Sequence, residues 1–138
     1  MQTLRHVVAG TDFSSPADRA LDLALALATA CAVPVTVVHV CELDDDDPGD
    51  RRLLALGRAL AELVASRRRS GVEVTGVLRS GRPWEKLDNV ATDVGAGLIV
   101  IGRHGSGRGP RVALGSVAEH LVRTASRPVL TVTCTFDR

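Results

Sequence analysis

The sequence predicts an α/β fold in which one open, twisted sheet of five parallel strands carries helices on both faces. The first observation is that short apolar runs alternate along the chain with segments whose apolar residues recur at helical spacing. The second is that most of these runs are continuously apolar, which is typical of parallel strands buried on both faces and joined by right-handed crossovers. The third is the length of 138 residues, which suits one domain with a sizeable core. We therefore expect a single domain over residues 1–138.

Five segments are expected to form the strands. Four are short runs rich in Val, Leu and Ile that are bordered by a Gly or a Pro, and the remaining one, Val72–Leu78, has a strand-like pattern. In chain order, the strands are expected at Val7–Gly10, Val35–Val40, Val72–Leu78, Leu98–Ile101 and Val129–Cys134. Strands and helices then alternate from the first strand to the last, with four helices between them.

The first two helices are predicted from their start and stop signals. Ser15 and Pro16 supply an N-cap and a proline at the first helical position, with Asp18 in a place that resembles a capping box. One face of this helix is expected to hold Ala20, Leu21, Ala24, Ala28 and Cys31. The second helix is predicted by helical spacing of Leu53, Leu56, Leu60, Leu63 and Val64. Arg67–Arg69 complement the negative end of its dipole, and Gly71 suits its stop.

The last two helices follow the same logic. Arg82 and Pro83 open the third helix, whose apolar stripe consists of Trp84, Leu87, Ala91 and Val94. The fourth is expected to begin at Ser116, because Ser116 and Glu119 have the spacing of a capping box. Its apolar positions are Val117, Leu121 and Ala125.

Composition excludes several classes of function. Aromatic residues make up 2% of the chain and the net charge is +1, so we expect neither a nucleic acid partner nor an anionic membrane surface. No apolar signal core or uncharged run of about 20 residues is present, and we expect a cytoplasmic protein. The three cysteines have no spacing typical of a disulfide framework or a zinc site. The acidic run Asp44–Asp47 is interpreted as a solvated loop rather than a metal site.

Two predicted strand ends carry the residues from which a binding site could be built. In an open α/β sheet, ligands bind outside the carboxyl ends of the strands. Gly10, Thr11 and Asp12 follow the first strand, and Gly102–Gly109 follows the fourth, with four glycines in eight residues. From Leu98 to Ala118 the chain contains no Asp or Glu, whereas it contains Arg103, His104, Arg108 and Arg111.

This loop predicts an anion site, with phosphate as the expected anion. Glycines let backbone amides approach an anion, and the helix start after the loop adds unpaired amides and a partial positive charge. The alternative is a flexible connector in which Ser116 only caps its helix. The loop is neither a Walker sequence nor a Rossmann fingerprint.

The spacing Gly102-x2-Gly105-x9-Gly115-Ser116 resembles the G-x2-G-x9-G-[ST] signature of the universal stress protein family, in its ATP-binding branch. The resemblance covers nearly the whole chain, and further segments that carry it are His6–Ser14, Val37–Val40, Gly115–Glu119 and Arg127–Val132. It implies a Rossmann-like sheet of the adenine nucleotide alpha hydrolase-like kind, with strand order 3-2-1-4-5.

The resemblance also implies a role for each residue at the two strand ends. Backbone amides and the Ser116 hydroxyl would hold the triphosphate, through Gly102, Gly105, Gly115 and Ser116. The same cradle would be lined by Arg103, His104 and Val117. Asp12 would lie beside the ribose or near a phosphate-bound Mg²⁺, with Gly10 and Thr11 alongside. The backbone of Val40 would meet the adenine edge, with Ile101 packing near it.

The function implied is that of a nucleotide-binding, non-metabolic stress-response protein that pairs as a homodimer through Val129–Cys134. We do not expect an enzyme, and any ATP hydrolysis would be slow because Asp12 is the only acid near the proposed phosphates. One alternative is an adenylyl-transfer or pyrophosphatase enzyme, although Thr11–Ser14 supplies no loop for that chemistry. Another is an interaction module with an unoccupied cleft, because Arg103 stands where the family more often has a small Ser or Thr.

Overall fold

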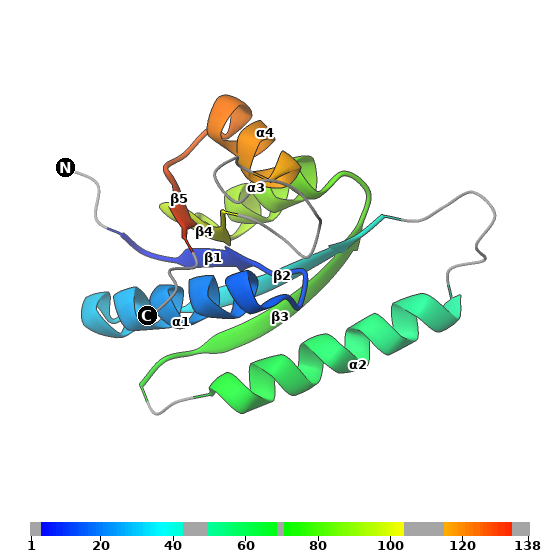
Figure 1. The fold of residues 1–138 in the computed structure, drawn as a ribbon. Helices are drawn as coiled ribbons and strands as arrows, with labels where there is room; N and C mark the ends of the chain where they lie inside the picture. The colour runs from blue at the N-terminus through cyan, green and yellow to red at the C-terminus, as the bar shows by residue number, and fades with distance from the viewer. Residues whose placement is uncertain (1–3, 43–49, 69–70, 104–114, 134–138) are drawn as a thin grey trace, which may run out of the picture.

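The computed structural model of the protein describes residues 4–42, 50–68, 71–103 and 115–133. Its sheet has five parallel strands in the order β3-β2-β1-β4-β5, which confirms the predicted fold class and strand order (Figure 1). The strands are β1 Val7–Gly10, β2 Val35–Cys41, β3 Val74–Ser80, β4 Leu98–Gly102 and β5 Val129–Val132. The helices are α1 Ser15–Cys31, α2 Asp50–Arg67, α3 Pro83–Val94 and α4 Ser116–Thr124.

Two hydrophobic layers enclose the sheet. Figure 1 shows α1 and α2 on one face and α3 and α4 on the other. Successive strand residues point to opposite faces, so Val7 packs with the α1 and α2 cluster while Val8 packs with the α3 and α4 cluster. Leu21 of α1 and Leu121 of α4 are fully buried at the two layers. This burial on both faces explains why the strands have continuous apolar sequences.

The starts of α1 and α4 each differ from the prediction by one residue. Ser14, not Ser15, is the N-cap of α1, because Ser14 has extended backbone angles and its Oγ accepts the Ala17 N–H at 3.3 Å. Gly115 is the N-cap of α4, and Ser116 is therefore its first helical residue. The predicted capping box is wrong. Glu119 instead forms an ion pair with Arg123 one turn later, at 2.9 Å.

Other element boundaries shift for local reasons. Cys31 was expected on the buried face of α1 but is exposed, because the apolar face ends at Ala28 and Ala32 closes the helix in the left-handed conformation (φ 55°). Strand β3 begins and ends two residues later than predicted, although Val72 before it is buried. Ala125 lies just after α4 as its C-cap.

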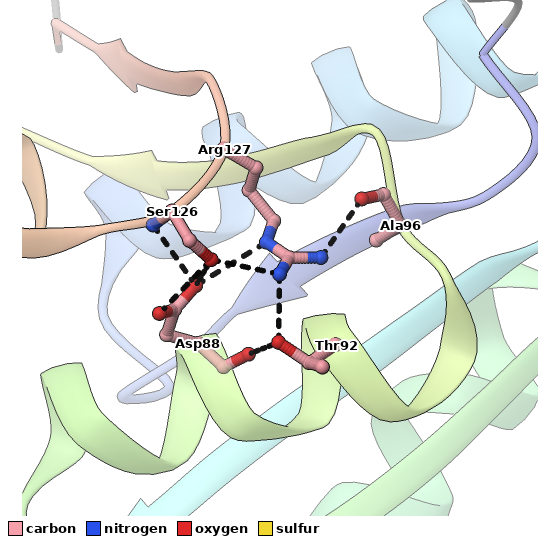
Figure 2. Close-up of polar contacts among 5 residues, drawn as sticks. All are labelled: Asp88, Thr92, Ala96, Ser126 and Arg127. Carbon is pink, nitrogen blue, oxygen red and sulfur yellow. Dashed lines mark hydrogen bonds and ion pairs between the residues drawn. The ribbon is translucent and has the colours of Figure 1, made fainter.

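A polar network fastens the amino edge of the sheet, the edge at which the strands begin. Figure 2 shows Arg127, just before β5, reaching into the end of α3. Its Nε donates to Asp88 Oδ1 at 3.2 Å, one terminal nitrogen donates to the Ala96 carbonyl at 3.1 Å, and the other donates to Thr92 Oγ1 at 2.6 Å and Ser126 Oγ at 2.9 Å. We call these five residues the Arg127 network. It joins α3 to the α4–β5 connection.

Candidate functional site

The candidate site lies at the carboxyl edge of the sheet, where β1 and β4 end side by side. Strand β1 pairs with β2 on one side and with β4 on the other, so the chain order of the strands diverges between β1 and β4. Ligands of open α/β sheets bind at such a divergence. The structure therefore brings Gly10–Asp12 and Gly102–Arg103, the described part of the predicted segment Gly102–Gly109, to one edge of the sheet.

Gly10 has a packing role at this edge. A Cβ atom at Gly10 would lie 3.0 Å from a methyl carbon of Ile101 and 3.1 Å from the methyl carbons of Leu87. These distances are tighter than ordinary van der Waals contact, so the side chains of Ile101 and Leu87 would have to shift to admit a larger residue. Gly10 thereby lets Ile101, a predicted site residue, lie against the end of β1.

Residues Thr11–Ser14 form a tight turn that carries Asp12. The Thr11 N–H donates to the Val38 carbonyl at 2.8 Å, and the Phe13 N–H donates to Thr11 Oγ1 at 2.9 Å. The Ser14 N–H donates to Asp12 Oδ1 at 3.0 Å. Phe13 has a φ of 65°, in the left-handed region that non-glycine residues rarely occupy. The turn therefore holds the exposed Asp12 carboxylate directly before α1.

His39 supports this turn from β2. Its Nδ1 lies 2.7 Å from the Thr11 carbonyl oxygen, and its ring lies 4.7 Å from the Phe13 ring, centroid to centroid. Sequence reasoning missed His39, which stands one residue before the predicted adenine contact Val40 in a strand that otherwise reads as apolar. Its position beside that residue was the one available signal.

Val40 lies beyond the end of β1. Gly10, the last residue of β1, pairs with Val38, so Val40 is two residues past the last β1–β2 pair. Val40 is half-buried and packs in the same hydrophobic cluster as Ile101 and Val117. The structure thus brings together these three predicted site residues, which come from β2, β4 and α4.

The end of β4 and the start of α4 are joined directly. The Gly115 N–H donates to the Arg103 carbonyl at 2.8 Å, and the Arg103 N–H donates to the Val132 carbonyl at 2.9 Å. Gly102 precedes Arg103 and Ser116 follows Gly115 in the sequence. The hydrogen bond therefore brings Gly102 and Ser116 close, as the motif predicts. The predicted site residues His104 and Gly105 lie outside the described residues, as do Arg108 and Arg111.

The start of α4 has the chemistry of an anion site. The first N–H groups of a helix have no acceptor within the helix, and a glycine N-cap has no side chain to offer them one. Because the Gly115 N–H is engaged by Arg103, the donors that α4 presents are the amides of Ser116 and Val117 and the exposed Ser116 hydroxyl. His120 Nδ1 contacts the Ser116 carbonyl at 2.8 Å and stacks on Trp84, which steadies this turn against α3.

The described residues offer few metal ligands. No group of three or more His, Cys, Asp or Glu that could hold a metal ion occurs in the described ranges, and Asp44–Asp47 lie outside them. A cation at this edge would have Asp12 as its protein ligand and would need further oxygens from a bound ligand. Of the cysteines within those ranges, Cys31 and Cys41 are free thiols.

None of the helices in the described parts of the chain combines the length and the apolar character that crossing a membrane requires.

Comparisons with known proteins agree over the whole fold. The family model of the universal stress protein family matches residues 3–133. The universal stress protein of Methanocaldococcus jannaschii is 27% identical over 152 aligned positions, which cover 93% of this chain and 94% of that protein. Its solved structure matches with a TM-score of 0.76 and 25% identity, over 99% of this chain and 100% of that one.

Two further relatives were solved with nucleotides. The universal stress protein from Archaeoglobus fulgidus in complex with dAMP is 29% identical, with a TM-score of 0.74 over 96% of this chain and 99% of that chain. A universal stress protein in complex with cAMP is 26% identical, with a TM-score of 0.69 over 96% of this chain and 100% of that chain. Both ligands are adenine nucleotides.

Proposed function

This chain belongs to the universal stress protein family, and we propose that it binds ATP, with Mg²⁺, at the carboxyl edge of β1 and β4. The observation that carries the proposal is the junction between β4 and α4. There the Gly115–Arg103 hydrogen bond sets an uncapped helix start beside the strand end that carries Gly102. The relatives solved with dAMP and cAMP support an adenine nucleotide as the ligand class.

The phosphates would lie at the start of α4. The amides of Ser116 and Val117 and the Ser116 hydroxyl would donate to phosphate oxygens, helped by the positive end of the helix dipole. Arg103, which is half-buried and directly follows β4, would add a cation to the cradle. The motif glycines Gly102 and Gly105 would leave room for the phosphates to approach the backbone.

The nucleoside would lie over the ends of β1 and β2. The backbone of Val40 is placed beyond the last β1–β2 pair, where it can meet the adenine edge, and Ile101 forms part of the apolar floor. Asp12 and Thr11 would lie beside the ribose. Mg²⁺, when bound, would neutralise phosphate charge, with Asp12 as its protein ligand.

The proposed role is regulatory rather than metabolic. Among the residues that the motif assigns to the site, Asp12 is the one acid, so any hydrolysis would be slow. Residues Val129–Val132 of β5 are half-buried at the edge of the sheet. An apolar edge strand requires a cover, and a second copy of the chain at β5 would supply it in a homodimer.

The rival function is an interaction module with a vestigial cleft. It is favoured by the engagement of the Gly115 N–H with the Arg103 carbonyl, which leaves the start of α4 one amide fewer for a phosphate. The two functions differ in the effect of a substitution at the start of α4. Such a substitution would weaken nucleotide binding at a working site, whereas a vestigial cleft has no nucleotide affinity to lose.

Calorimetric titration with Mg-ATP tests the proposal. We expect the protein to bind, and Ser116→Ala to weaken binding by roughly ten- to hundredfold through the loss of one hydrogen bond to a charged group. Thr124→Ala is the matched control, because it removes a hydroxyl from the last residue of the same helix, where Thr124 Oγ1 donates to the His120 carbonyl. Equal affinities for the two variants, or no binding at millimolar Mg-ATP, would reject the proposal.

A further inference from the structure

We infer that His39 is the positioning residue of the nucleotide site, because it holds the turn that presents Asp12. The inference rests on the proposed function and adds to it the element that fixes Asp12, the proposed acidic residue of the site. His39 is half-buried on β2, and it contacts the residues on both sides of Asp12 in the chain, Thr11 and Phe13.

The contact to Thr11 is a directed hydrogen bond. His39 Nδ1 lies 2.7 Å from the Thr11 carbonyl oxygen. A carbonyl oxygen only accepts, so Nδ1 carries the hydrogen and donates. This bond joins β2 to β1 beyond their last paired residues, Gly10 and Val38. It therefore extends the pairing of the two strands by a side chain at the point where the backbone of β1 turns away.

The contact to Phe13 explains how an unfavourable conformation persists. Phe13 has a φ of 65°, and a residue with a side chain occupies that region only when its surroundings impose it. The His39 ring packs against the Phe13 ring at 4.7 Å with an interplanar angle of 43°. His39 thus braces the strained residue that follows Asp12.

The orientation of Asp12 depends on this same turn. The Phe13 N–H bonds to Thr11 Oγ1, and the Ser14 N–H bonds to Asp12 Oδ1. Both bonds require the backbone of Thr11–Phe13 to stay folded as it is. Because the turn is held in advance, binding a nucleotide would not have to order it, and preorganisation of this kind raises affinity.

Two substitutions separate the hydrogen bond from the ring contact. His39→Phe keeps a ring against Phe13 and removes the donor to Thr11. His39→Asn places an amide nitrogen the same number of bonds from Cβ as Nδ1, so it keeps the donor and removes the ring. If His39 only fills space, the Phe variant should be the milder of the two.

The experiment measures Mg-ATP affinity by calorimetry, at a temperature where urea unfolding shows every variant to be folded. We expect His39→Phe to weaken binding about five- to tenfold, as for the loss of one hydrogen bond, and His39→Asn to stay within about twofold of the unsubstituted protein. In an Asp12→Ala background, His39→Phe should have no further effect, because both changes act on the same carboxylate.

Amide hydrogen exchange at Phe13 and Ser14 provides a readout that needs no nucleotide. We expect exchange at these two amides to quicken in His39→Phe, while amides of the sheet core stay protected. Normal ATP binding by His39→Phe, or an undiminished effect of His39→Phe in the Asp12→Ala background, would overturn the inference and leave the proposed function intact. If the unsubstituted protein binds no ATP, the proposed function and this role of His39 both fail. If amide exchange at Phe13 and Ser14 is unchanged in His39→Phe, His39 does not support the turn.

Discussion

The two edges of the sheet are built in opposite ways. At the amino edge, the Arg127 guanidinium donates to four groups of the protein, and its ion pair with Asp88 is largely shielded, with side-chain exposures of 15% and 25%. At the carboxyl edge, the Asp12 carboxylate is exposed, and α4 begins at a glycine that cannot cap it. The bonded groups of the amino edge hold the fold together, whereas the carboxyl edge carries the polar groups that we propose for the ligand.

The same contrast separates the helix starts at the carboxyl edge. Helix α1 begins with Ser14, whose side chain accepts an amide of the first turn. Helix α4 begins with Gly115, which leaves its first-turn amides to another acceptor. Of these two helices, the one beside the predicted phosphate site lacks a side-chain cap, as does α3 at Arg82. Three substitutions test the part of this contrast that concerns stability.

The largest expected effect is at the amino edge. Arg127→Met should lower the free energy of unfolding by about 2–3 kcal/mol, because the Asp88 carboxylate would stay shielded without its partner. The loss is somewhat smaller than for a fully buried ion pair, since both side chains are partly exposed. The matched control is Arg123→Met, which breaks an exposed ion pair with Glu119 and should cost less than about 1 kcal/mol. Urea unfolding measures both. Equal losses would contradict the distinction between the network and an ordinary surface pair.

The second effect concerns Gly10, a carboxyl-edge residue that the packing assigns to stability. Gly10→Ala should destabilise the protein by about 1–2 kcal/mol, because its Cβ would crowd Ile101 and Leu87. Gly57→Ala is the control within α2, where the nearest atom would be 3.9 Å away. That change should instead stabilise the helix by about 0.5–1 kcal/mol. If the two changes had the same sign in thermal unfolding, the packing argument would be wrong.

The smallest effect is a pH dependence at the amino edge. Burial lowers the pKa of His6, and the nearby Glu73 carboxylate offsets part of this lowering. His6 Nε2 contacts Thr36 Oγ1 at 2.7 Å. With a lowered pKa the folded protein binds this proton less readily than the unfolded chain. The contribution of His6 to stability is therefore complete above about pH 6.5 and declines as pH falls below it. His6→Gln should reduce the rise of the free energy of unfolding with pH just below about pH 6.5, and an unchanged slope would contradict this assignment.

Apolar patterning determined most of the fold. Continuous runs such as Leu98–Ile101 identified the strands because both of their faces are buried. Helix starts were harder to predict. Ser14 and Ser15 are adjacent and equally suitable as N-caps by residue type, and the turn at Phe13 decides between them. The helical spacing of Cys31 predicted that it is buried. The buried face of α1 ends at Ala28 instead, and the helix closes at the left-handed cap Ala32.

The candidate site was predicted in part. The glycine spacing predicted that the end of β4 and the start of α4 lie together, and the Gly115–Arg103 hydrogen bond does join them. His39 could not be found in this way, because its partner Thr11 lies 28 residues away and is reached only through the register of β1 and β2. Nor does a sequence reveal that the Gly115 amide is engaged, since such a bond depends on the path of the folded chain.

The division between the two edges is tested most directly by following backbone amide resonances during a titration with Mg-ATP. The account predicts that resonances of Asp12, Val40, Ser116 and Val117 shift, and that those of Asp88, Ser126 and Arg127 at the far edge stay in place. Shifts centred on the Arg127 network, or none anywhere at millimolar nucleotide, would contradict it.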